Sequence, residues 1–127
     1  MPYTSQLIDD DTGVLNIGSG SVHGFEILLV AQRVQWLAGS ARLTHILTDL
    51  TLVTELHIST VEIRELAAVN LVTAQLAPGG RAAIVAPENH VFGLARMWSA
   101  FMDDSGWEIR IFRDLVAATS WLERPSR

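Results

Sequence analysis

The spacing of apolar residues along the chain predicts both strands and helices. Alternation with period two predicts a strand, whereas recurrence every three to four positions predicts a helix with one apolar face. By these criteria strands are expected near residues 4–8, 14–18, 45–50, 81–86 and 107–112. Helices are expected over about residues 24–38 and 60–76, from near residue 89, and over about residues 114–123. Strands and helices therefore alternate over most of the chain.

The order of these elements predicts an α/β fold. Residues 9–13, Asp-Asp-Asp-Thr-Gly, suit a tight hairpin and make the first two strands antiparallel. The strand-helix units that follow predict parallel strands, and residues 81–86, which show no alternation, suit a central strand covered on both faces. We therefore expect one domain over residues 1–127, with a mixed, mostly parallel sheet of about five strands, an N-terminal antiparallel strand and about four surrounding helices.

Composition excludes several classes of function. The chain has no cysteine, which excludes disulfides and thiolate chemistry, and all nine basic residues are arginine, which excludes Schiff-base lysines and the phosphate-loop lysine. A net charge of -5 without a basic stripe argues against nucleic-acid binding. The start of the chain lacks the regions of a signal peptide, and no apolar run is long enough to span a membrane. We therefore expect a cytoplasmic protein without stable membrane insertion.

The helix expected over residues 24–38 has two apolar faces. Its core face is formed by Ile27, Val30, Ala31, Val34 and Leu37. Phe25, Leu29 and Trp36 lie on the opposite side, where a monomer would leave them in water. The helix over residues 60–76 also carries apolar residues on two sides. The second stripe favours a homodimer, and the alternatives are a movable helix over an apolar pocket and scattered exposed residues.

The helix that begins near Asn89 combines a core face with an acidic outer face. Its core arc consists of Val91, Leu94, Ala95, Trp98, Phe101 and Met102. Asp103 and Asp104 outweigh Arg96 on the polar side, whereas a helix that docks on anionic lipid requires basic residues there. Permanent membrane docking by this helix is therefore not expected.

Polar side chains gather in the loops that follow the strands. Because the carboxyl ends of parallel strands meet at one edge of a sheet, His57, His90 and Arg113 are expected there. Phe92 and Met97 flank the core arc of the adjacent helix and offer apolar surface. These residues are the candidate site for a small apolar or amphipathic ligand, whose polar head would lie at the histidines or the arginine. The alternative is that helix and loops close on each other and leave no cavity.

The sequence offers no strong signal for a metal, a cofactor or catalysis. His23, His57 and His90 are expected at the same edge, but no pair has the short spacing of helical metal ligands. The segment "GSGSVHG" departs from the dinucleotide fingerprint, because His23 stands where the third glycine belongs, and it is expected to form a turn and a helix entry. We expect a non-enzymatic protein with no metal and no cofactor. An enzyme that pairs His57 with Ser59, or His90 with Glu88, is the alternative.

Ser59 stands immediately before the helix expected over residues 60–76. Glu62 follows it three positions later, and Ser-x-x-Glu before a helix is the sequence pattern of a capping box. The Ser59 hydroxyl is therefore expected to cap the helix, whatever else it does.

Several motifs resemble those of SpoIIAA-like proteins. The resemblance lies in "TDL" at the end of the third strand, "RAAIVAPENHVFGLARMW" across a strand and a helix, and "IFRDLVAATSWL" near the end of the chain. SpoIIAA-like proteins are relatives of the STAS domain (sulfate transporter and anti-sigma-factor antagonist) and are similar to lipid-binding CRAL-TRIO (SEC14) modules. The resemblance implies a STAS-like fold and a non-enzymatic binding or regulatory module, often dimeric, with ligand or transient membrane association.

The same resemblance implies an alternative function. When residues 49–66 are laid on the phosphorylation segment of STAS proteins, Ser59 lies near the serine that partner kinases modify. His57 stands where an acidic residue is expected, and Thr60 stands where a glycine is expected. The alternative function is thus a protein-interaction switch of the anti-sigma-factor-antagonist type, phosphorylated at Ser59.

Overall fold

The structure of the protein, a computed structural model, describes residues 2–40 and 42–124. Along the chain its elements are β1 (Tyr3–Ile8), β2 (Gly13–His23), α1 (Gly24–Ala38), β3 (His45–His57), α2 (Thr60–Leu76), β4 (Arg81–Val85), α3 (Asn89–Phe101), β5 (Glu108–Phe112) and α4 (Leu115–Leu122). The alternation of strands and helices predicted from the sequence is confirmed.

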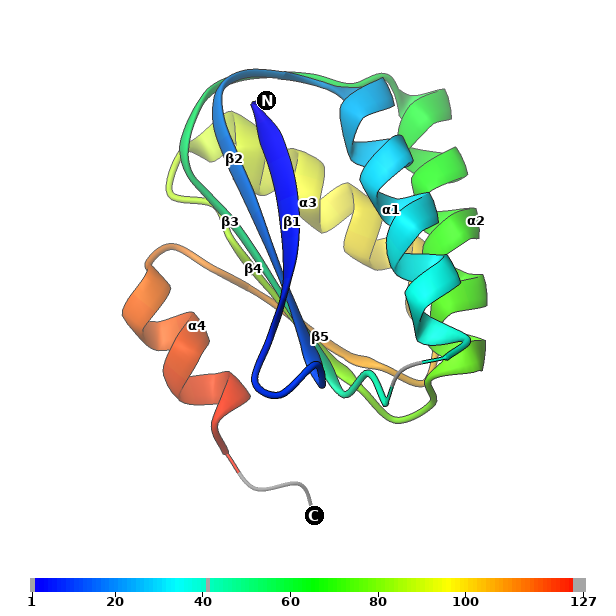
Figure 1. Ribbon diagram of the computed structural model, residues 1–127. Coiled ribbons are helices and arrows are strands. Elements are labelled where there is room, and N and C mark those ends of the chain that lie inside the picture. Colours follow the sequence, from blue (N-terminus) through cyan, green and yellow to red (C-terminus); the bar gives the residue numbers. More distant parts are fainter. Residues whose placement is uncertain (1, 41, 125–127) are drawn as a thin grey trace.

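The strands form one mixed sheet in the order β1-β2-β3-β4-β5. β1 is antiparallel to β2, and the pairs β2-β3, β3-β4 and β4-β5 are parallel, as predicted. From β2 to β5, each parallel strand is added beside the previous one on the same side of the sheet. Because such crossovers are right-handed, the helices that connect these strands lie on the same face. Accordingly α1, α2 and α3 cover one face of the sheet and α4 covers the other (Figure 1).

β2 and β3 continue together beyond the part of the sheet that includes β4. Their pairing ends with His23 opposite His57, whereas β4 pairs with β3 only as far as Asp49. The turn expected in "GSGSVHG" is wrong, because all but its last glycine belongs to β2. The expected helix entry is confirmed, because α1 begins at Gly24 with His23 as its N-cap. Gly20 has a φ of 66° beside an irregularity in the register, and the side chain of Val22 is fully buried. A bulged strand with one buried side therefore replaces the expected turn.

The hairpin between β1 and β2 is present, but its turn is formed by the aspartates, and the glycine lies in β2. Asp9, Asp10 and Asp11 take positive φ values of 53°, 55° and 65°, which aspartate tolerates better than most residues. Gly13 already belongs to β2, where a Cβ atom would overlap Nε2 of His45. That nitrogen lies 2.7 Å from Oδ2 of Asp9, so the histidine ties the turn to β3. The glycine is therefore needed for close approach rather than for a positive φ.

Each face of the sheet has its own hydrophobic core. The larger core lies beneath α1, α2 and α3, and the smaller one joins Ala83 and Val85 of β4 to Ala118 and Trp121 of α4. Most of the predicted core arc of α3 faces the larger core. Phe101 is the exception, because its side chain is 39% exposed and the Arg64 guanidinium lies 5.7 Å from its ring centroid.

α2 differs from α1 and α3 in how closely its backbone approaches the sheet. The backbones of α1 and α3 come close to strands β1, β2 and β5, whereas that of α2 comes close mainly to α1 and α3. Side chains on the inner side of α2, among them Ile63 and Ala74, are buried and line the same space as residues of the sheet.

Candidate functional site

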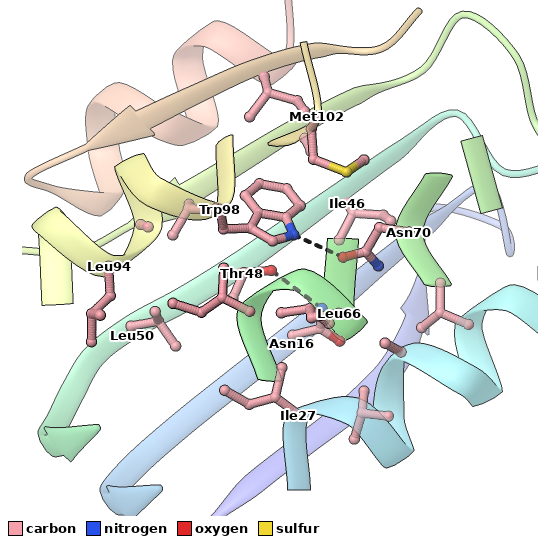
Figure 2. Close-up of a pocket in the computed structure, with 18 of the residues that line it drawn as sticks. Asn16, Ile27, Ile46, Thr48, Leu50, Leu66, Asn70, Leu94, Trp98 and Met102 are labelled. Carbon is pink, nitrogen blue, oxygen red and sulfur yellow. Dashed lines mark hydrogen bonds between the residues drawn. The ribbon is translucent and has the colours of Figure 1, made fainter. Parts of the chain in front are cut away.

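A partly open cavity lies between the sheet and the three helices that cover its larger core. Its volume is ≈ 130 Å³, about ten times the space that one water molecule needs. Side chains from five strands and three helices line it, and most of them are apolar (Figure 2). The polar or partly polar members are Tyr3, Asn16, Thr48, Asn70, Thr73, Trp98 and Trp107. This combination of apolar walls and a few polar groups is typical of small-molecule sites.

Short side chains occupy core positions on all three helices and on one strand around the cavity. The alanines that line it are Ala31 on α1, Ala74 on α2, Ala82 on β4 and Ala95 on α3. All of them are buried, so larger residues there would project into the space now open. The sequence shows these alanines on the predicted core faces, but their shared location depends on how three helices are placed over the sheet.

A polar pair lies on the floor of the cavity. Asn16 of β2 and Thr48 of β3 are register partners, and Nδ2 of Asn16 donates to Oγ1 of Thr48 at 3.2 Å (Figure 2). The Asn16 residue is only 8% exposed, and its Oδ1 atom has no hydrogen-bond partner in the described part of the chain. An unpaired buried carbonyl oxygen costs about 1–3 kcal/mol, so this acceptor is unusual in a native interior.

Tyr3 adds a third polar group beside this pair. Burial raises the pKa of its hydroxyl well above the usual value of 10.0, and a side-chain hydrogen bond with Thr48 opposes that effect in part. The Tyr3 hydroxyl therefore stays protonated and uncharged at neutral pH. Of the described residues, those that line the cavity include no Asp, Glu, Arg or His, so the whole site is uncharged.

Two indole groups tie the helices around the cavity. Nε1 of Trp98 on α3 donates to Oδ1 of Asn70 on α2 at 2.9 Å, and both side chains appear together in Figure 2. Nε1 of Trp107, before β5, donates to the carbonyl oxygen of Ala77, just after α2, at 2.7 Å. These bonds hold α2 above the cavity at two points.

The ligand site predicted at the loop edge is only partly assembled. The guanidinium carbon of Arg113 lies 3.9 Å from the ring centroid of Phe92. Its Nη1 atom donates to the carbonyl oxygen of Pro87 at 2.9 Å and to Oδ1 of Asn89 at 2.8 Å. Arg113 and Phe92 thus come together as predicted, but the arginine already makes contacts within the protein.

The remaining members of that predicted site make other contacts or are exposed. The ring of His57 stacks on that of His23, with 4.8 Å between centroids, and its Nε2 atom lies 3.3 Å from Glu55. His90 and Met97 are exposed on α3. In residues 2–40 and 42–124 no three acidic, histidine or cysteine side chains are grouped closely enough to hold a metal ion. None of the residues predicted from the sequence to bind ligand is among those that line the cavity.

The capping box predicted at Ser59 is confirmed. Oγ of Ser59 accepts from the backbone N–H of Glu62 at 3.1 Å, and the Ser59 N–H donates to Oε1 of Glu62 at 2.9 Å. Glu62 also approaches Gly24, where a Cβ atom would lie 2.7 Å from its carboxyl group. Ser59 is exposed, and its phosphorylation stays a prediction.

The second apolar stripe of α1 is exposed in the isolated chain. Phe25, Leu29 and Trp36 all face solvent, and Trp36 is 78% exposed. On the neighbouring α2, Val61, Val72 and Leu76 are exposed as well. The partner expected from the sequence, a second copy of the chain, stays a prediction.

Sequence reasoning missed Asn16, Thr48 and Asn70. A signal was present for the first two, since each is a polar residue at the centre of a strand and on its core-facing side. The alternation in residues 14–17 and 46–50 places them inward with Val14 and Ile46. Asn70 gave no comparable signal, because a polar residue within an amphipathic helix is ordinary.

The comparisons with known proteins concern the fold. A crystal structure of an uncharacterized protein with a SpoIIAA-like fold from Shewanella loihica PV-4 matches 94% of this chain and 91% of that chain, with a TM-score of 0.59 and 17% identity. An anti-sigma factor antagonist from Mycobacterium paratuberculosis matches 96% of this chain and 95% of that chain, with a TM-score of 0.56 and 15% identity. No protein-family model matches the sequence, and no curated protein matches it.

These matches confirm the SpoIIAA-like fold expected from the resemblance of the sequence. At these identities they establish the arrangement of the chain and not its ligands or partners. Within the described residues, no helix has the length and apolar character needed to cross a membrane.

Proposed function

We propose that the protein is a non-enzymatic binding module that holds a small apolar or amphipathic ligand in the cavity beneath α2. The observation that carries this proposal is the cavity itself, which has apolar walls, an uncharged polar floor and a volume of ≈ 130 Å³. A regulatory role through a partner protein would then depend on whether the cavity is filled.

The short side chains around the cavity support the proposal. Buried alanines line it where leucine would fill the space, so the protein keeps room there at the expense of tighter packing. Asn16, whose buried Oδ1 atom accepts no hydrogen bond from the described residues, lies in the same lining. Both features are common at functional sites.

The cavity is a better location for the ligand than the loop edge predicted from the sequence. Of the edge residues, His57, His90, Met97 and Arg113 are exposed, and the arginine is engaged by Pro87 and Asn89. The cavity, in contrast, can remove much of a ligand's apolar surface from water, which gives most of the binding free energy of an apolar molecule.

Native mass spectrometry of the freshly purified protein tests the proposal. We expect a complex heavier than the chain, from which denaturation releases a small molecule. Ala74→Leu, which fills the cavity, should reduce the occupancy and stabilise the ligand-free protein by about 0.5–2 kcal/mol. Ala68→Leu, on the exposed side of the same helix, is the matched control and should leave the occupancy unchanged. Ligand retained at the same level in Ala74→Leu would contradict the assignment of the cavity.

The second candidate function is the switch phosphorylated at Ser59. It is supported by the exposure of Ser59 and by the structural likeness to an anti-sigma factor antagonist. A phosphate at the start of α2 would meet favourable backbone N–H groups but also the Glu62 carboxylate, which already occupies one of them. Incubation with a kinase-containing extract should add one phosphate to the wild type and none to Ser59→Ala. An unmodified wild type would contradict this function.

A further inference from the structure

We infer that the cavity selects an uncharged ligand that carries a hydrogen-bond donor, such as a hydroxyl group on an apolar body, and that Oδ1 of Asn16 accepts this hydrogen bond. The inference rests on the proposed function, because it specifies which chemistry the same cavity would bind. It concerns the ligand class, which neither the fold nor the likeness to known structures indicates.

The absence of charge around the cavity excludes ionised ligands from it. No Asp, Glu, Arg or His is among the described residues that line the walls. A carboxylate or a phosphate placed there would lose its hydration without gaining a counter-charge, which is among the most costly transfers in protein chemistry. Fatty acids and phosphorylated compounds are therefore poor ligands for this cavity. The corresponding alcohols carry no charge and do not meet this cost.

The polar groups of the lining differ in whether they are already paired. Oδ1 of Asn70 accepts from Trp98 at 2.9 Å, and the Thr73 hydroxyl donates to the carbonyl oxygen of Val69 at 3.3 Å. Nδ2 of Asn16 donates to Thr48, which leaves Oδ1 of Asn16 as a buried acceptor without a partner in residues 2–40 and 42–124. A ligand that donates a hydrogen bond to this atom satisfies it, whereas a ligand with only acceptors leaves it unpaired.

The opposite orientation of the Asn16 amide would predict the opposite ligand preference. If the amide were turned over, its oxygen would face Thr48 and its NH₂ group would face the cavity. The site would then prefer a ligand that accepts a hydrogen bond and does not donate one. A donor and an acceptor of the same shape therefore distinguish the two orientations.

Calorimetric titration with three related probes tests the inference. The probes are 2-naphthol, its methyl ether 2-methoxynaphthalene and 2-naphthoate, which share a flat apolar body and differ in donor capacity and charge. We expect 2-naphthol to bind roughly three- to tenfold more tightly than the ether, as one net hydrogen bond implies, and 2-naphthoate to bind most weakly. Asn16→Leu should abolish the preference for 2-naphthol over the ether. Thr73→Val, which changes another buried polar residue of the same cavity, is the control and should keep it.

The outcomes separate this inference from the proposed function. Binding of the ether as tight as that of 2-naphthol, or tighter binding of 2-naphthoate, would overturn the inference and leave the cavity as a binding site. If none of the probes binds, and cavity-filling Ala74→Leu also leaves the occupancy of the purified protein unchanged, the proposed function fails with it. Should Asn16→Leu fold poorly, the ranking of the probes on the wild type still decides the inference.

Discussion

Tyr3 makes the stability of the folded protein depend on pH in the alkaline range. It is the only tyrosine in a chain that has no cysteine and no lysine, so no other side chain titrates between the histidines and the arginines at high pH. Because burial raises its pKa in the folded state above the value of 10.0, its contribution to stability is fully present below pH 10.0. That contribution decreases as the pH rises above 10.0 toward the raised pKa.

We expect the free energy of unfolding to decrease above pH 10.0 by about 1.4 kcal/mol per pH unit. In Tyr3→Phe this dependence should be absent, because the variant has no phenol to ionise in either state. Urea denaturation at a series of alkaline pH values measures the slope, and the ultraviolet absorbance of the phenolate reports ionisation independently. A folded wild type whose phenol ionises near pH 10 would contradict the burial of this hydroxyl.

Ser59 is the residue whose structural role is most fully contained in the local sequence. Ser59→Ala should lower the free energy of unfolding by about 1 kcal/mol, because the N–H of Glu62 loses its acceptor. Ser59→Asp should keep much of the stability, since aspartate also caps helices. Thermal or chemical denaturation checks both variants against Thr60→Ala, the exposed neighbour. Equal stability of Ser59→Ala and the wild type would show that the capping box contributes nothing.

The contrast between Ser59 and Asn16 shows what the sequence reveals at this scale. A capping box is formed by residues three positions apart, so the pattern alone predicted it. Asn16 depends on Thr48, which is distant in the sequence, and on a cavity formed by helices that come later in the chain. Its inward position on the strand could have been predicted, but its missing partner could not.

At the scale of elements, α2 determines whether the cavity exists. Its backbone lies closest to α1 and α3, and the hydrogen bond between Trp98 and Asn70 joins it to α3. Glu62 at its start and the carbonyl oxygen of Ala77 after its end make further contacts that hold it in place. Outward movement of α2, which would break these contacts, would admit a ligand.

Trp98→Phe tests whether the hydrogen bond between Trp98 and Asn70 holds α2 against α3. The substitution keeps an aromatic ring and removes the donor to Asn70, so we expect a loss of about 1 kcal/mol and faster hydrogen exchange in α2. Trp36→Phe on the exposed face of α1 is the matched control, with a change within about 0.5 kcal/mol. Exchange rates in α2 that are the same in Trp98→Phe and the wild type would mean that the bond does not hold the helix.

Element types were easier to predict than strand ends. The four helices and five strands of residues 2–40 and 42–124 were expected in the right order, because the apolar period of each helix is regular and the central strand is a continuous apolar run. The extension of β2 over residues 19–23 was missed, since glycine and serine disfavour strands and resemble a turn. Pairing with the long β3 overrides that local preference, and such pairing is not visible from one segment.

At the scale of the whole molecule, the exposed stripe of α1 predicts self-association. Phe25, Leu29 and Trp36 would lose their contact with water in a homodimer. Replacing Leu29 and Trp36 together by glutamine should give a folded monomer, whereas Val116→Ser, at an exposed apolar residue of α4, should leave the dimer intact. Light scattering at micromolar concentration measures the subunit number. A monomeric wild type would end this prediction.

The central claim is that a ligand enters the cavity beneath α2, and the tryptophan indoles test it most directly. The chain has four tryptophans. Trp98 and Trp107 line the cavity, Trp36 lies on the outer stripe of α1, and Trp121 of α4 packs against β4 on the other face of the sheet. In proton–nitrogen correlation spectra recorded during titration with 2-naphthol, the signals of Trp98 and Trp107 should shift and those of Trp36 and Trp121 should stay in place. A shift confined to Trp36, or no shift at any indole, would contradict the account.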